Sequence, residues 1–222
     1  MALFRDRSNA VPSNMTGRRL WPAVHAERAA LAADLTGLTD EQWTTPSLCP
    51  GLSVREVLAH LTAGASLNPL RWFAGVVRCR FDFDKQVAMR LAEQLGASPA
   101  ETLARFRGVV RSTTAPPLPT VALLGEIVVH GEDIRRPLGI DHDYPIELVT
   151  QLATFYTSSD LMLVGKSRVA GLRLVATDGP FVAGAGPLVS GTTLAITMAT
   201  TGRAEYCDHL TGDGVETLRA RS

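Results

Sequence analysis

Two histidines and one glutamate are the side chains of this sequence whose types and spacing could hold a metal ion. Glu126 and His130 stand four residues apart in a segment that we expect to be helical, so both lie on one face and can reach the same ion. His60 lies in a separate expected helix. Helical bundles build metal sites in this way, from side chains on facing helices. Two imidazoles and a carboxylate suit zinc or another first-row divalent metal, and three protein ligands leave one coordination position open for chemistry.

Spacing alone leaves other interpretations open, because Glu-x-x-x-His pairs occur by chance and a histidine beside leucines is commonly a satisfied core residue. Motifs for other chemistry are incomplete. The Gly-Lys-Ser run at 165–167 ends like a phosphate-binding loop, but Asp160 stands where the upstream glycine is required. The Gly-Ala-Gly run at 184–186 is followed by Val189 where a dinucleotide fingerprint has its third glycine. There is also no Gly-x-Ser-x-Gly elbow.

The composition is that of a folded, electrically balanced protein. The chain has 222 residues, of which 45% are hydrophobic and 20% are charged, and 22 Lys+Arg balance 22 Asp+Glu. This balance does not predict a nucleic-acid or anionic-membrane partner. Three widely spaced cysteines (Cys49, Cys79, Cys207) argue against a disulfide framework. Because we find neither a signal peptide nor an apolar run long enough to span a membrane, we expect a cytoplasmic protein.

Apolar periodicity predicts that residues 17–164 are helical and that residues 1–16 form a loose arm. Ser53 and Glu56 form a capping-box pattern at the start of the helix that holds His60. Residues 39–51 look like a turn-rich connection. The expected helices lie at about 21–38, from 54 onward, 68–80, 84–95, 99–113, 120–137 and 145–164.

The pattern changes after Gly171. Residues 172–177 alternate and are β-branched like a strand, and two further short strands are expected at 181–183 and 187–189. An apolar helix is expected at 194–201. We therefore predict a mainly α protein with two domains, a helical bundle at 17–165 and a small α/β domain at 170–222.

Two segments around the three candidate ligands resemble the mycothiol-dependent maleylpyruvate isomerase family of the DinB-like superfamily. The first is WTTPSLCPGLSV at 43–54, which leads into VLAHL at 57–61, and the second is GEIVVHGEDIRRPLG at 125–139. The resemblance implies a DinB-like four-helix bundle with a small C-terminal α/β domain, and zinc held by His60, Glu126 and His130. Leu52 stands where such proteins usually carry Trp; we expect this to change packing near the site without abolishing the metal.

The tail resembles the same family's short C-terminal domain. The matching stretches are ATD at 176–178, GAGP at 184–187, TGR at 201–203 and LTGDG at 210–214. The resemblance implies that Arg203 reaches the active site as a catalytic residue, where it could hold a substrate carboxylate. The alternative is a surface arginine at a helix end. For Asp133 we favour pairing with Arg135 or Arg136 on a solvated face over orienting a ligand, and for Cys49 we favour buried packing.

The resemblance also implies a function. A low-molecular-weight thiol, mycothiol, would be activated by the metal and attack a small electrophile, either to isomerise a cis double bond or to form a stable thioether. Two other classes stay open: a metal-binding protein without catalysis, and a metal-dependent hydrolase that uses metal-bound hydroxide. The ligand set suits all three, so the sequence does not identify the substrate, the metal or the oligomeric state.

Overall fold

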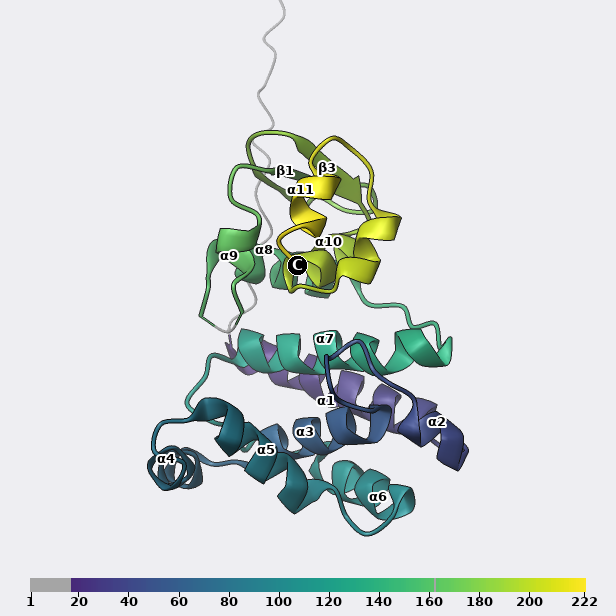
Figure 1. Cartoon of the computed structure of the whole chain (residues 1–222), viewed down its shortest axis with the longest axis vertical. Coiled ribbons are helices and arrows are strands. Elements are labelled where there is room, and N and C mark those ends of the chain that lie inside the picture. Colours follow the sequence, from purple (N-terminus) through teal and green to yellow (C-terminus); the bar gives the residue numbers. More distant parts are fainter. Residues whose placement is uncertain (1–16, 162) are drawn as a thin grey trace, which may run out of the picture.

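The helices around the three candidate ligands form the lower layers of the molecule in Figure 1. The structure, a computed structural model, describes residues 17–161 and 163–222, so the arm expected at 1–16 lies outside the described residues. This part contains α1 (Gly17–Asp34), α2 (Asp40–Thr44), α3 (Val54–Ser66), α4 (Pro69–Arg78), α5 (Phe83–Gln94), α6 (Pro99–Val109) and α7 (Thr120–Leu138). Helix α7 packs against α1 and α3, and α3 also packs against α5 and α6. Helix α3 is therefore central, which suits its largely apolar composition.

Local sequence signals account for where these helices begin and end. At the start of α3 the Ser53 hydroxyl accepts a hydrogen bond from the Glu56 backbone, and the Glu56 carboxylate accepts one from the Ser53 backbone. The capping box predicted there is confirmed. Helix α7 ends at Gly139, which adopts φ 67° and ψ 29°, the left-handed conformation that glycine tolerates best. The expected turn-rich connection 39–51 contains one additional short helix, α2, whose own capping box joins Thr39 and Gln42.

The C-terminal part forms a small sheet covered by short helices. It contains α8 (Ile146–Ser158), α9 (Gly165–Arg168), β1 (Arg173–Ala176), β2 (Val182–Gly184), β3 (Leu188–Gly191), α10 (Thr193–Thr200), the 3-10 helix η1 (Ala204–His209) and α11 (Val215–Arg219). The strand order is β2-β1-β3, with β2 antiparallel and β3 parallel to β1. Helix α8, which the sequence assigned to the bundle, packs against α10 and lies with the sheet layer in Figure 1. The division into 17–165 and 170–222 stays a prediction.

Helix α8 is shorter than the expected 145–164 because polar side chains capture its backbone. Ser159 leaves the helical conformation with φ −144° and ψ 143°, and its hydroxyl accepts a hydrogen bond from the Leu161 backbone. The Asp160 carboxylate then accepts hydrogen bonds from the backbone and hydroxyl of Ser167. Serine and aspartate compete in this way with helical hydrogen bonding.

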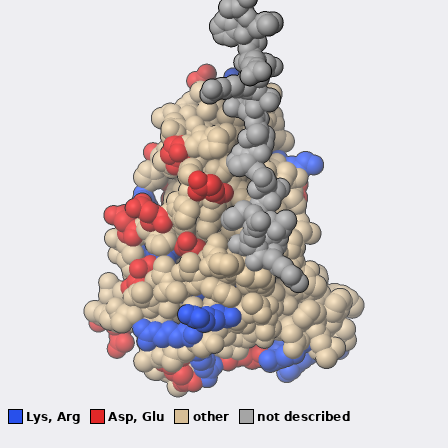
Figure 2. Space-filling model, turned by 180° about the vertical axis from the view of Figure 1, so that it is seen from behind, with Lys and Arg blue, Asp and Glu red and all other residues tan. Residues whose placement is uncertain are grey.

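One apolar core runs through both layers, from Leu20 and Leu58 in the bundle to Leu174 and Ile196 beside the sheet. The predicted fold class, mainly α with a small C-terminal α/β part, is confirmed. In the described part of the chain no helix is both long and apolar enough to cross a bilayer. On the face shown in Figure 2, basic side chains gather toward the end that α4, α5 and α6 form, and acidic side chains lie mostly above them.

Candidate metal centre

His60, Glu126 and His130 converge where α3 faces α7. One Glu126 oxygen, Oε2, lies 3.3 Å from Nε2 of His60 and 3.7 Å from Nε2 of His130. The two imidazole rings meet edge to face, with centroids 4.9 Å apart. One ligand atom from each of the three residues lies within 4.8 Å of the others. The one-turn spacing on α7 thus places two donors side by side, and the packing of α3 supplies the third.

The three side chains also influence one another electrostatically. Burial pushes the pKa of Glu126 up, but the hydrogen bond from His60 and the charges of both histidines outweigh it and lower that pKa to about 2. Burial pushes the pKa of His60 down, but its hydrogen bond to Glu126 and the charge of that carboxylate outweigh it and raise the pKa. Glu126 is therefore an anion at neutral pH, which is the form that binds a metal.

Asp133 stands directly behind His130 and corrects our expectation. It is fully buried and accepts a hydrogen bond from Nδ1 of His130 at 2.8 Å, so it does not pair with Arg135 or Arg136 on a solvated face. Burial pushes the pKa of Asp133 up, but the hydrogen bonds from Arg203 and His130 outweigh it and lower the pKa. A carboxylate that binds Nδ1 fixes the ring and leaves Nε2 free toward the site, as the supporting residues of metal-bound histidines do.

Arg203 reaches this cluster from the C-terminal part of the chain. It is 8% exposed, so the alternative of a surface arginine is wrong. Its Nε and Nη2 donate to the two oxygens of Asp133 at 2.9 and 2.5 Å, and Nη1 donates to the carbonyl of Thr201 at 3.0 Å. The guanidinium therefore supports Asp133, and a direct catalytic role for Arg203 stays a prediction.

Cys49 packs against the apolar core, as expected, and it also lies beside this cluster. It is half-buried, and its sulfur lies within 4.8 Å of ligand atoms of His130 and Asp133. The loop is held there by a hydrogen bond from the Leu48 backbone to the carbonyl of Asp133, at 3.1 Å. Burial and the charge of Asp133 raise the pKa of the Cys49 thiol. The thiol is therefore kept protonated, which argues against a nucleophilic role.

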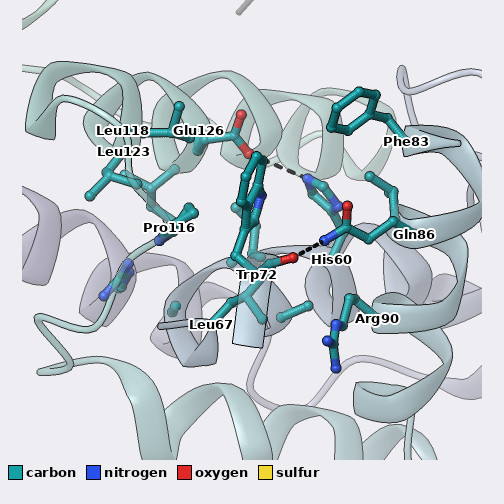
Figure 3. A pocket seen from close by; sticks show the side chains of 17 residues that line it. His60, Leu67, Trp72, Phe83, Gln86, Arg90, Pro116, Leu118, Leu123 and Glu126 are labelled. Carbon is teal, nitrogen blue, oxygen red and sulfur yellow. Dashed lines mark hydrogen bonds and ion pairs between the residues drawn. The ribbon is translucent and has the colours of Figure 1, made fainter. Parts of the chain in front are cut away.

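A pocket of about 240 Å³ opens beside His60 and Glu126. Figure 3 shows these two side chains facing each other, with Trp72 next to them. The side-chain nitrogen of Gln86 donates a hydrogen bond to the carbonyl of Trp72 at 3.0 Å, tying α5 to α4. Most of the wall is apolar and comes from α3, α4, α5 and the segment 116–127; it includes Leu61, Leu67, Phe83, Pro116, Leu118 and Leu123. A mainly apolar pocket with a few polar groups at one point is the usual form of a small-molecule site.

The donor set fits a divalent metal. Two neutral imidazole nitrogens and one carboxylate match zinc. The buried carboxylate of Asp133 holds the His130 ring in place, as a hydrogen-bonded carboxylate commonly does for metal-bound histidines. His60 and Glu126 line the pocket, so a molecule bound there can approach two of the three candidate ligands. The sequence-based reasoning missed the wall residues Trp72 and Gln86, and also Arg28, because no motif marks them.

Comparison with known proteins agrees with the family suggested by the two segments. Residues 24–120 match the model of the mycothiol maleylpyruvate isomerase N-terminal domain. A crystal structure of the mycothiol-dependent maleylpyruvate isomerase superposes with a TM-score of 0.59 at 17% identity, covering 90% of this chain and 93% of that chain. A variant of that isomerase with one histidine replaced by alanine gives a TM-score of 0.59 at 16% identity, with coverage of 90% and 93%. No curated protein matches the chain.

Proposed function

We propose that the chain is a thiol-dependent isomerase or S-transferase, because residues 24–120 match the model of the mycothiol maleylpyruvate isomerase N-terminal domain. In this proposal His60, Glu126 and His130 hold a divalent metal, with zinc as the first candidate. Mycothiol is the co-substrate, and a small electrophile is the substrate. The observation that carries the proposal is the convergence of three donor atoms, two of which belong to residues that line a pocket large enough for a small molecule.

The metal, when bound, would lower the pKa of a thiol so that thiolate is present near neutral pH. In an isomerase the sulfur donates an electron pair to one carbon of a cis double bond conjugated to a carbonyl. The bond between the two carbons is then single and rotates. Expulsion of the thiolate restores the double bond in the trans form, so no atom is gained or lost. In a transferase the adduct takes up a proton and leaves as a thioether.

The residues of this chain orient the ligands and shape the pocket. Asp133 holds the His130 ring so that Nε2 points toward Glu126. Arg203 neutralises Asp133, so we assign it a positioning role through that carboxylate rather than contact with the reacting atoms. The apolar wall around Trp72 limits water near the reacting carbon, which protects a thiolate adduct from side reactions.

Metal content is the first test. The protein would be purified without chelators or a histidine tag, and bound metals measured by plasma mass spectrometry beside His130→Ala and His209→Ala. His209 is an exposed histidine bonded to Arg136, away from the three ligands, and serves as the control. We expect about one divalent ion per chain in the wild type and in His209→Ala, and loss of the ion in His130→Ala. Absence of stoichiometric metal after zinc addition would reject the metal centre.

Thiol dependence is the second test. Metal-loaded protein would be assayed against a panel of cis-enones and other electrophiles, with mycothiol present or omitted. Turnover that requires mycothiol is the expected result. Ester or amide hydrolysis without thiol would favour a metal-dependent hydrolase instead. Bound metal with no turnover across the panel would favour a binding protein.

A further inference from the structure

Arg28 is a buried cation without a carboxylate partner in the described part of the chain. Three arginines are buried there: Arg28, Arg135 and Arg203. Arg135 pairs with Asp34 at 2.8 Å and Arg203 pairs with Asp133. Arg28, at 6% exposure, forms no ion pair with a described residue.

The neighbours of Arg28 do not neutralise it. Its Nη1 donates to the carbonyls of Val109 and Ser112 at 3.3 and 2.9 Å, at the end of α6. Its Nε and Nη2 make no hydrogen bond to a described residue. The adjacent Glu27 is already paired with His142 at 2.9 Å. The end of a helix carries only about half a negative charge, so these carbonyls compensate Arg28 incompletely.

Burial alone lowers the pKa of Arg28 to about 10, with no contribution from a nearby acid. The side chain is therefore still charged at neutral pH. Buried charges in proteins are normally paired, because removing them from water is costly. A charge left unpaired in this way points to a partner other than the described residues.

That partner can arrive through the pocket, because Arg28 lines the same pocket as His60 and Glu126. A second arginine at the wall, Arg90, is already occupied: it pairs with Glu93 at 3.0 Å and donates to the carbonyl of Arg71. Many of the other lining residues are apolar; they include Leu61 and Ala65 on α3, and Leu118 and Leu123. The pocket thus combines one cation without an ion-pair partner, Arg28, with a mainly apolar wall.

We propose that this pocket binds a monocarboxylate with an apolar or aromatic body, whose carboxylate pairs with Arg28 and whose other end approaches His60 and Glu126. A guanidinium with free Nε and Nη2 groups can hold a carboxylate through two parallel hydrogen bonds. The apolar wall selects against a ligand that carries many hydroxyl or charged groups along its length. The inference rests on the proposed function in one respect: it takes this monocarboxylate to be the electrophilic substrate.

The test is equilibrium binding of a matched pair of unreactive probes, 4-phenylbutyrate and its neutral amide, measured by isothermal titration calorimetry on the full chain. No thiol is present, so the result does not depend on turnover. We expect the wild type to bind the acid at least tenfold more tightly than the amide. Arg28→Met should reduce this preference to about onefold, and Arg28→Lys should retain part of it.

Arg107→Gln is the matched control, because Arg107 is an exposed arginine on α6 that donates to Thr36 outside the pocket. It should keep the wild-type preference.

Circular dichroism and the melting temperature would show whether each variant is folded. If Arg28→Met fails to fold, the wild-type ratio and Arg28→Lys still decide the question. Equal binding of acid and amide by the wild type, no binding of either, or an unchanged ratio in folded Arg28→Met would overturn the inference. Each of these results leaves the thiol-dependence test untouched.

Discussion

Arg203 and Asp133 lie 70 residues apart in the sequence, yet two hydrogen bonds of 2.9 and 2.5 Å join the guanidinium to both carboxylate oxygens. Asp133 in turn accepts a hydrogen bond from Nδ1 of His130 at 2.8 Å. The C-terminal part of the chain therefore supports a candidate metal ligand in the bundle through a single buried ion pair. The contribution of this ion pair to the free energy of unfolding and its effect on metal affinity can both be measured.

Removing Arg203 should destabilise the fold. Arg203→Met leaves the Asp133 carboxylate buried with one counter-group fewer, and loss of one partner of a buried pair costs about 3–5 kcal/mol. We expect a reduction of that order in the free energy of unfolding, measured by urea denaturation. The control is Arg173→Met, because Arg173 is exposed on β1 and should change the stability by less than about 0.5 kcal/mol. Similar stabilities for the two variants would contradict the importance of the pair.

Asp133→Asn should weaken metal binding without removing a ligand. The amide can still contact His130 but no longer carries the charge that strengthens Nε2 as a donor. Loss of such a supporting carboxylate typically costs 10–100-fold in metal affinity. Competition of zinc against a chromophoric chelator would measure the dissociation constant. The double variant Asp133→Asn with Arg203→Met removes both charges. Comparing it with each single variant separates two causes of weaker metal binding: loss of the carboxylate that orients His130, and the presence of an arginine that has lost its ion-pair partner.

Acid should compete with metal at His60. Since Glu126 raises the pKa of His60 above its ordinary 6.5, a proton occupies the imidazole over a wider pH range in the metal-free protein. Zinc must displace that proton, so its apparent affinity should fall about tenfold for each pH unit below the pKa of His60. An NMR titration of the metal-free protein would locate this pKa. An affinity that stays constant between the pKa of His60 and one pH unit below it would contradict the competition.

The same shift predicts how pH affects the stability of the metal-free protein. A raised folded-state pKa stabilises the fold below the unfolded value of about 6.5, and this contribution disappears as the pH rises through the folded-state pKa. The difference in unfolding free energy between wild type and Glu126→Gln should therefore shrink as the pH rises through that range. Denaturation curves at several pH values would show it. A difference that grows with pH would mean that Glu126 does not stabilise protonated His60.

The capping box before α3 should contribute to stability but not to metal binding. Ser53→Ala removes the hydroxyl that accepts a hydrogen bond from the Glu56 backbone, and loss of such a cap costs about 0.5–2 kcal/mol. Ser53→Thr keeps the hydroxyl and should restore most of the stability. Metal content should be unchanged in both variants, because His60 lies two turns further along the helix. Metal loss in the folded Ser53→Ala variant would instead indicate that the cap positions His60.

The sequence by itself determined the local features of this protein. The capping box placed the start of α3, and the pattern from 120 to 137 placed α7 to within a few residues, because these signals act over one or two helical turns. The spacing of Glu126 and His130 put them on one helix face for the same reason. His60 was predicted as the third ligand from the way helical bundles build metal sites and from the family resemblance, because no local signal links two separate helices.

Only the tertiary structure decided the contacts that depend on how helices and layers pack. It turned Asp133 inward onto His130 and Arg203, although neighbouring Arg135 and Arg136 made a local pairing the simpler expectation. It brought Cys49 to the same cluster, and it left Arg28 buried at a pocket wall without a carboxylate among the described residues. The physical reason is that burial, and therefore the strength of each charge interaction, is set by packing between segments tens of residues apart, which no local pattern encodes.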